Sequence, residues 1–125
     1  MALIDFGGVK EKVVMRDEFP MSKARKVLKD ETIAVIGYGV QGPAQALNMK
    51  DNGFNVIVGQ SSEFKRDWDR ERKDGWRPGK DLFDIDEAAR RGTIVQMLVS
   101  DAAQKVIWSI IKQRLEPGNA LYFSR

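Results

Sequence analysis

The chain has 125 residues, 42% hydrophobic and 31% charged, a balance that excludes collagen-like, low-complexity and wholly disordered proteins. It contains neither cysteine nor histidine, which excludes disulfides, thiolate chemistry and a Ser-His-Asp hydrolase. Its net charge of +3 is small, and charges of both signs alternate between Lys65 and Lys73, so a nucleic-acid partner is not expected. No apolar run approaches the roughly 18 residues of a membrane helix, and the first residues do not resemble a secretory signal. We therefore expect a cytoplasmic protein with no membrane partner.

The first 30 residues are predicted to form a polar lead-in that ends in one helix. A short strand is expected at residues 13–14 and a stop at residues 18–20. Ser22 is a candidate N-cap for a helix that continues to about Lys29.

From residue 31 onward, predicted strands and helices alternate. Short apolar runs predict strands at residues 32–36, 55–59, 93–99 and 120–123. Helices are predicted at residues 41–52, 63–74, 85–91 and 102–114, the third capped by Asp84 and the last with an apolar face of Val106, Ile107, Ile110 and Ile111. Residues 75–79 are expected to be a loop, with room for a very short strand. The continuous apolarity of the first strands is typical of a parallel sheet that is buried on both faces.

A glycine-rich motif, G-x-G-x-x-G, occupies residues 37–42, directly after a predicted buried strand and at the start of a predicted helix. In that context Gly37 allows a tight turn, Gly39 lets the backbone approach a pyrophosphate, and Gly42 lets the helix pack close to the strand. The helix N-terminus then presents free N–H groups to the phosphates. The alternative is a glycine-rich turn without a ligand. The motif favours an α/β fold, a Rossmann-like, mainly parallel sheet with helices on both faces, in one NAD(P)-binding domain over residues 1–125.

The end of the second strand bears on the choice between NADPH and NADH. An NAD site usually places a carboxylate there to bind the ribose 2′-hydroxyl. Here the hydroxyls of Ser61 and Ser62 follow the strand, with Lys65 and Arg66 just beyond. Hydroxyls and cations suit a 2′-phosphate, so NADPH is favoured. NADH remains the alternative cofactor, because the Glu63 carboxylate could reach back to the ribose.

The third strand ends in Ser100 and Asp101, either of which could cap the next helix and also contact the cofactor. The full set of candidate cofactor-binding residues follows the three strands: Gly37, Tyr38, Gly39, Val40, Gln41, Gly42, Gln60, Ser61, Ser62, Lys65, Arg66, Ser100, Asp101, Ala102, Ala103 and Gln104.

Several blocks of sequence, in order, resemble ketol-acid reductoisomerase (acetohydroxy acid isomeroreductase). They cover residues 16–20, 37–43, 47–48, 51–53, 58–60, 74–76, 98–104 and 120–124. The resemblance implies an oxidoreductase of valine, leucine and isoleucine synthesis that depends on NADPH and Mg²⁺. It implies alkyl migration assisted by Mg²⁺, followed by hydride transfer, which converts acetohydroxy acids to dihydroxy acids. It also implies that residues 38–41 and 101–104 contact the cofactor.

Three departures from the family pattern limit what the resemblance implies. Ser61 stands where the family usually has an arginine that grips the 2′-phosphate, and the loop up to Trp68 is about one residue longer. Arg125 stands where the family usually has a catalytic histidine. The family's magnesium carboxylates lie in a helical C-terminal domain that these residues do not include.

We therefore expect no catalytic residue and no metal ligand within residues 1–125, and no reductoisomerase activity from the chain alone. The last strand should leave an exposed edge, so self-association or a partner that supplies the C-terminal domain is expected. The alternative function is a non-catalytic dinucleotide sensor or scaffold module.

Overall fold

The computed structural model describes residues 1–123, so Ser124 and the expected departure at Arg125 lie outside the described residues. The chain divides into two compact units, Met1–Asp30 and Glu31–Arg125, which are described separately. Within the described residues, no helix is long and apolar enough to cross a membrane.

The first unit starts with a β-hairpin where the sequence predicted only one short strand. Strands β1 (Ala2–Asp5) and β2 (Lys10–Val13) pair in antiparallel orientation. Gly7 and Gly8 lie in the connection between them with φ of +73° and +98°. A Gly-Gly pair between two short runs is the sequence signal that could have predicted this hairpin.

A 3₁₀ turn, η1 (Arg16–Glu18), and the helix α1 (Met21–Val27) complete the first unit. The helix was predicted correctly, but its N-cap was not. Pro20 holds the N-cap position with extended backbone (φ −67°), and Ser22 lies inside the first turn. The fixed φ of proline suits a residue at the very start of a helix, which explains the earlier boundary.

The second unit is built on a five-stranded sheet in which every neighbouring pair of strands is parallel. The strands are β3 (Ile33–Ile36), β4 (Val56–Gly59), β5 (Leu82–Phe83), β6 (Ile94–Met97) and β7 (Ala120–Phe123), in the spatial order β5-β4-β3-β6-β7. All four residues of β3 and of β4 are buried, as the continuous apolar runs predicted. The short strand β5 lies a few residues after the predicted place, and at residues 75–79 only Pro78 makes a bridge, to Leu82.

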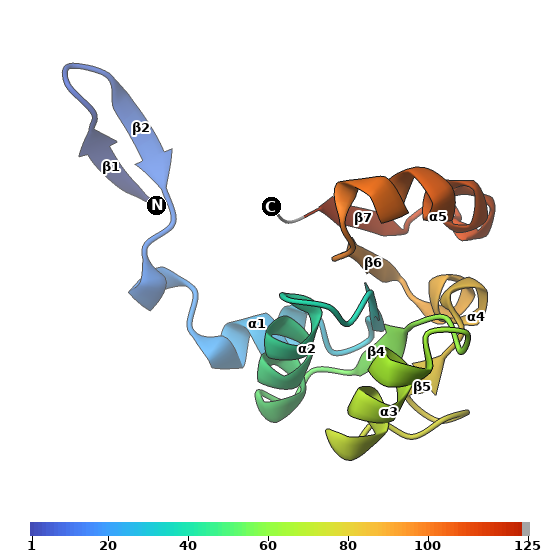
Figure 1. The fold of residues 1–125 in the computed structure, drawn as a ribbon. Helices are drawn as coiled ribbons and strands as arrows, with labels where there is room; N and C mark the ends of the chain where they lie inside the picture. The colour runs from blue at the N-terminus through green and yellow to red at the C-terminus, as the bar shows by residue number, and fades with distance from the viewer. Residues whose placement is uncertain (124–125) are drawn as a thin grey trace. The chain divides into compact units, whose positions relative to one another are not determined.

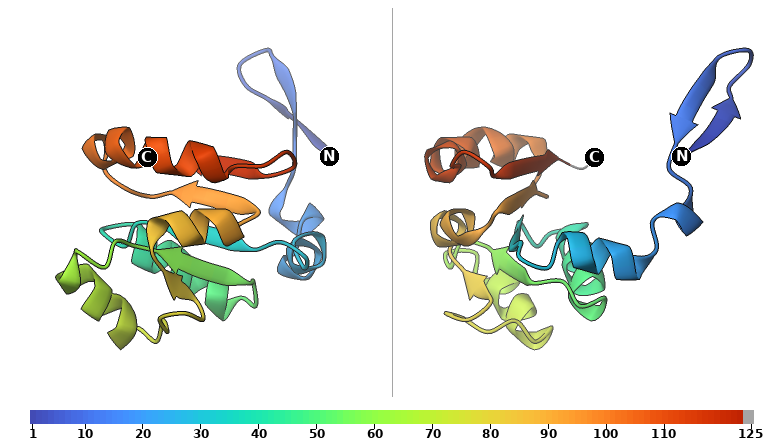
Figure 2. Two further views of the ribbon diagram at one scale, coloured as in Figure 1. Left: turned by 90° about the vertical axis from the view of Figure 1, so that its right-hand side faces the viewer. Right: turned by 180° about the vertical axis from the view of Figure 1, so that it is seen from behind.

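Helices cover both faces of this sheet, which confirms the predicted fold class. They are α2 (Gly42–Asp51), α3 (Lys65–Lys73), α4 (Ile85–Arg91) and α5 (Asp101–Arg114). The core on one face combines alternate strand residues with Ala88 and Ala89 of α4 and Ile111 of α5. The core on the other face includes Ala46 of α2 and Trp76, with Trp68 of α3 packed against it. Figure 1 and Figure 2 show α4 and α5 on one side of the strands and α2 on the other.

The strand order positions the site. From the central strand β3 the chain moves outward to β4 and β5, and then crosses back to β6 on the other side of β3. The connections that leave β3 and β6 therefore diverge at the carboxyl ends of the strands and open a crevice there, where sheets of this type bind ligands.

Candidate functional site

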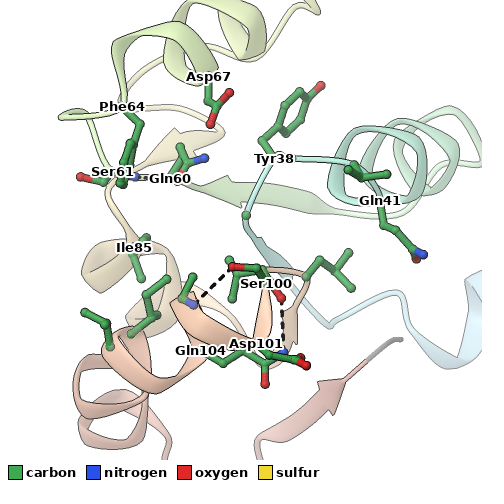
Figure 3. A pocket seen from close by; sticks show the side chains of 18 of the residues that line it. Tyr38, Gln41, Gln60, Ser61, Phe64, Asp67, Ile85, Ser100, Asp101 and Gln104 are labelled. Atoms are coloured by element: carbon green, nitrogen blue, oxygen red, sulfur yellow. Dashed lines mark hydrogen bonds between the residues drawn. The ribbon is translucent and has the colours of Figure 1, made fainter.

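A cavity of about 760 Å³ lies at the carboxyl ends of β3, β4 and β6. Its volume is within the range of small-molecule and cofactor sites. Eleven of the predicted binding residues line it: Gly37, Tyr38, Gly39, Val40, Gln41, Gln60, Ser61, Ser100, Asp101, Ala103 and Gln104. Figure 3 shows the side chains that follow β3 and β4 on one side of this cavity and those that start α5 on the other.

The glycine-rich turn has the geometry that its sequence predicted. Gly37 has φ +102°, and a Cβ there would lie 2.8 Å from the carbonyl oxygen of Leu98. A Cβ on Gly42 would collide with the carbonyl oxygen of Gly37, so α2 packs against the turn only because Gly42 has none. Around Gly39, by contrast, nothing lies within 4 Å of a Cβ position. The turn is therefore tight where it meets the sheet and open where it faces the cavity.

The N-terminus of α2 also faces this turn. Its N-cap residue, Gln41, makes no side-chain capping hydrogen bond. The first N–H groups of a helix have no partner within the helix, and together with the helix dipole they favour an anion. The open backbone at Gly39 and this helix start together fit a pyrophosphate.

Tyr38 ties the glycine-rich turn to the segment after α3. Its side chain is fully buried, and its hydroxyl donates to Asp74 Oδ2 (2.7 Å) and accepts from Trp76 Nε1 (3.0 Å). Burial and the hydrogen bond to Asp74 raise the pKa of the Tyr38 phenol well above its ordinary value. Arg70 of α3 adds a bond from Nη1 to the carbonyl oxygen of Gly39 (3.3 Å).

The segment after β4 differs from the prediction for the 2′-phosphate. Ser61 lines the cavity, but Ser62, Lys65 and Arg66 do not. The Ser62 N–H instead donates to Asp84 Oδ1 (3.2 Å), and Asp84 is the N-cap residue of α4 but makes no side-chain capping bond. Glu63, which the sequence analysis kept as the alternative contact to the ribose, lines the cavity here, together with Phe64 and Asp67, which the prediction omitted.

The physical reason is the helical period. Because α3 starts at Lys65, Phe64 and Asp67 lie on one face and Lys65 and Arg66 lie off it. The spacing 64, 67, 68, 71 within the predicted helix was the sequence signal for this face.

The third wall of the cavity is the start of α5. Ser100 Oγ accepts from the Ala103 N–H (3.3 Å), so the predicted cap is present. The predicted binding residues Gly42 and Ala102 do not line the cavity. An apolar wall, which the prediction did not include, is formed by Ile85, Leu98, Val99, Val106, Ile107 and Ile110.

The apolar face predicted for this helix is only partly core. Ile111 is buried and Ile107 packs against the core, but Val106 is 71% exposed and Ile110 38% exposed. Val106, Ile107 and Ile110 line the cavity, so part of the predicted apolar stripe faces the cavity and only part faces the core.

Metal ligands are not gathered at this cavity. Within residues 1–123, no group of three or more carboxylates is placed to hold a metal ion. The Mg²⁺ that the family resemblance implies stays an expectation for the whole protein.

A parallel sheet in this order, with a glycine-rich turn after its central strand and a cavity at the point where the strand order reverses, defines a doubly wound nucleotide-binding α/β domain. Residues 27–125 match the family described as acetohydroxy acid isomeroreductase, NADPH-binding domain. The chain belongs to this family.

Individual relatives agree with this assignment. A ketol-acid reductoisomerase (NAD(+)) from Desulfosudis oleivorans is 58% identical over 99% of the chain, and a mitochondrial ketol-acid reductoisomerase from Saccharomyces cerevisiae is 46% identical over 97%. The structure of an NADH-preferring ketol-acid reductoisomerase from an uncultured archaeon is similar over 92% of the chain, with a TM-score of 0.78 and 35% identity. The match covers 35%, 30% and 34% of these proteins, so the chain spans about a third of the length of its relatives.

Proposed function

We propose that this chain is the dinucleotide-binding domain of a ketol-acid reductoisomerase of branched-chain amino-acid biosynthesis. The observation that carries the proposal is the glycine-rich turn, open at Gly39, beside the uncapped N-terminus of α2 at the edge of the cavity. A bound nicotinamide supplies a hydride, and the residues of this chain hold the cofactor for that transfer.

The position of each wall suggests how a dinucleotide would lie. Residues 39–41 and the start of α2 would bind the pyrophosphate. Residues 60–67, at the end of the strand next to β3, would hold the adenosine ribose. Ser100, Asp101 and Gln104 would then lie toward the nicotinamide half, across the point where the strand order reverses.

NADPH is the cofactor that the sequence predicted and that the family description names. A specific observation favours NADH in this chain. Two carboxylates, of Glu63 and Asp67, line the cavity near Ser61, while the cations of Lys65 and Arg66 do not. A carboxylate accepts a hydrogen bond from a ribose 2′-hydroxyl and repels a 2′-phosphate. The similar proteins from Desulfosudis oleivorans and from the uncultured archaeon are named for NAD(+) or NADH. We therefore propose that the chain binds NADH more tightly than NADPH.

Calorimetric titration of the purified chain with each cofactor tests both proposals. We expect NADH to bind more tightly, and the double variant Glu63→Gln/Asp67→Asn to shift the preference toward NADPH by about tenfold, equal to about 1.4 kcal/mol. Lys65→Ala/Arg66→Ala is the matched control and should change the ratio of the two affinities little. A selective loss of NADPH binding in the control would restore the NADPH prediction, and no binding of either cofactor would contradict the proposed function.

The remaining expectations from the sequence stay predictions. They are a cytoplasmic location, the lack of reductoisomerase activity in residues 1–125 alone, and a partner or further chain that supplies the C-terminal domain. The Saccharomyces cerevisiae relative is named mitochondrial, which makes the location worth measuring in cells. A dinucleotide sensor or scaffold would also bind without turnover, and a partner chain that restores activity would distinguish the two functions.

A further inference from the structure

Glu71 is a buried carboxyl group that the proposed function does not use. It lies on the inward face of α3, and its side chain is 0% exposed. Within residues 1–123, neither of its carboxyl oxygens has a hydrogen-bond partner. An ionised carboxylate in such a place is costly, because nothing replaces the water that it loses.

The groups that face Glu71 do not compensate for a negative charge. Asp67, one turn earlier in α3, and Asp74, at the C-cap, both act on it unfavourably. Tyr38, from the glycine-rich turn, is close enough for the Glu71 charge to raise the pKa of its phenol. Burial first, and then Asp67 and Asp74, raise the pKa of Glu71 to about 8, so the group is mostly a neutral acid at pH 7.

Two cations near this segment, Lys50 and Arg70, make their contacts with other groups. Lys50 of α2 lies over the Trp76 ring, with Nζ 4.2 Å from its centroid, and pairs with Asp81 at 3.6 Å. The Arg70 guanidinium lies 5.8 Å from the centroid of the Tyr38 ring and bonds the Gly39 carbonyl oxygen. Neither cation contributes to the pKa of Glu71.

Two short paths connect Glu71 to the glycine-rich turn. Its own carbonyl oxygen accepts from the Trp76 N–H (3.1 Å), and the Trp76 indole donates to the Tyr38 hydroxyl. Its neighbour in sequence, Arg70, donates to Gly39. A shift of α3 that brought the Glu71 carboxylate to water would pull on both contacts.

We propose that Glu71 is a positioning residue: as a neutral acid it lets α3 pack against the glycine-rich turn, and loss of its proton loosens that turn and weakens dinucleotide binding. The consequence for binding rests on the proposed function. The coupling between Glu71 and the turn does not.

Cofactor affinity as a function of pH tests the consequence. NADH is the probe, because the 2′-phosphate of NADPH itself titrates near pH 6. Between pH 6.5 and pH 9 we expect the affinity of the chain for NADH to fall roughly five- to tenfold, a typical size for coupling between sites. Glu71→Gln, which carries no charge at any pH, should bind NADH with less than a twofold change over the same range.

Asp69→Asn is the matched control, since Asp69 is a carboxylate on the same helix that does not line the cavity. It should lose affinity with pH as the unmodified chain does. If the unmodified chain and Glu71→Gln lose affinity in parallel, the proposal is overturned. Glu71→Met, apolar and of similar length, repeats the comparison if the glutamine variant does not fold.

A titration without cofactor separates this inference from the proposed function. Carbon-13 NMR of the Glu71 carboxyl, assigned with Glu71→Gln, should show a midpoint near pH 8. The amide signal of Gly39 should move with the same midpoint. A Glu71 midpoint near the ordinary value of 4.5, or a Gly39 signal that does not follow it, would overturn the coupling. Absence of NADH binding at every pH would contradict the proposed function, and the NMR titration would still decide the coupling.

Discussion

At the scale of single residues, Tyr38 serves both the core and the site. Its backbone belongs to the turn that lines the cavity, while its ring is buried and its hydroxyl joins Asp74 to Trp76. Trp76 is only 1% exposed, so water cannot replace the bond that its indole N–H makes with Tyr38. One hydroxyl therefore keeps a buried donor satisfied and holds the turn at the segment after α3.

Tyr38→Phe removes that hydroxyl and keeps the ring. We expect the free energy of unfolding to fall by about 1–3 kcal/mol, because the buried indole N–H of Trp76 is left without a partner. Urea unfolding measures this change. Tyr122→Phe is the control, since Tyr122 in β7 is 44% exposed and should tolerate the change. Equal stability of the two variants would show that the Tyr38 bonds contribute little.

At the scale of elements, the unit β3–turn–α2 combines a buried strand with a helix that starts almost in contact with the turn. Gly42 is in the first position of α2 and lies against the carbonyl oxygen of Gly37, whereas Gly39 faces open space. The two positions thus require glycine for different reasons. The fold requires it at position 42, and the ligand that we propose requires it at position 39.

Gly42→Ala and Gly39→Ala should separate these requirements. We expect Gly42→Ala to destabilise the chain by about 1–3 kcal/mol, because its Cβ forces α2 away from the turn. Gly39→Ala should leave the melting temperature nearly unchanged and weaken NADH binding by roughly tenfold, about 1.4 kcal/mol. Thermal unfolding and calorimetric titration of both variants provide the comparison. Normal NADH binding by Gly39→Ala would mean that the pyrophosphate does not bind at Gly39.

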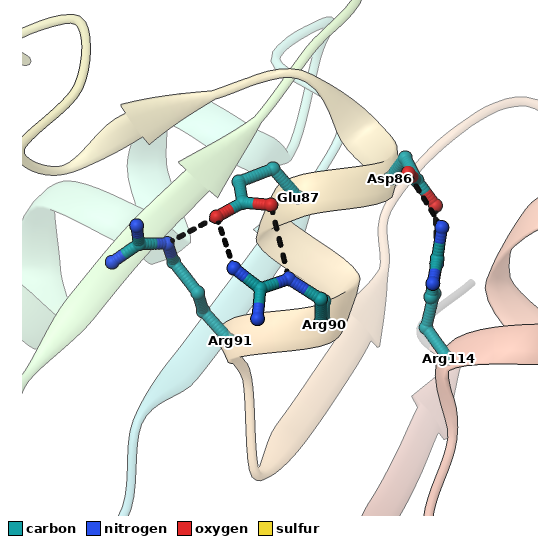
Figure 4. Close-up of polar contacts among 5 residues, drawn as sticks. All are labelled: Asp86, Glu87, Arg90, Arg91 and Arg114. Atoms are coloured by element: carbon teal, nitrogen blue, oxygen red, sulfur yellow. Dashed lines mark hydrogen bonds and ion pairs between the residues drawn. The ribbon is translucent and has the colours of Figure 1, made fainter.

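The contact between α4 and α5 combines surface ion pairs with buried apolar side chains. Arg114, at the end of α5, bonds Asp86 of α4 through Nε (2.5 Å) and Nη2 (2.9 Å), as Figure 4 shows. Glu87 accepts from Arg90 and Arg91, and these bonds lower its pKa to about 2. All of these groups are at the surface, where such pairs contribute little stability. The buried Ala88, Ala89 and Ile111 account for the contact between the helices.

At the scale of the whole molecule, one buried acid should shape the dependence of stability on pH. The pKa of Glu71 is about 8 in the folded chain and close to 4.5 when it is solvated. The folded state therefore holds one more proton than the unfolded state between these values, and stability falls as the pH rises through this window. Below pH 4.5 and above pH 8, Glu71 no longer changes the free energy of unfolding as the pH changes.

Glu71→Met removes the titrating group and keeps a helix-forming side chain of similar length. We expect the variant to be more stable than the unmodified chain by about 1–3 kcal/mol at pH 8, and the difference to shrink steadily toward pH 4.5. Urea unfolding at several pH values measures it. A difference that does not change with pH would mean that Glu71 ionises normally in the folded chain.

The edge of the sheet at β7 is a second feature of the whole molecule. β7 pairs only with β6 in the described sheet, and Tyr122 and Phe123 are exposed by 44% and 51%. Trp108 of α5, 39% exposed, lines a smaller hollow together with Phe123. The sequence analysis expected an exposed strand edge here, and β7 is an edge within the described sheet, while association with another chain stays a prediction.

The sequence by itself determined the alternating strands and helices after residue 31 and the chemistry of the turn, but not the first hairpin. Apolar runs at residues 32–36 and 55–59 favour buried strands, and the spacing of Gly37, Gly39 and Gly42 indicates a phosphate-binding turn, because both signals depend on local backbone geometry. The sequence spacing marked one face of α3, but only the tertiary structure decided that Glu63 and Asp67, and not Lys65 and Arg66, line the cavity and that Glu71 is buried. Those outcomes depend on where α3 begins and which side packs on the sheet, and contacts between residues distant in sequence set both.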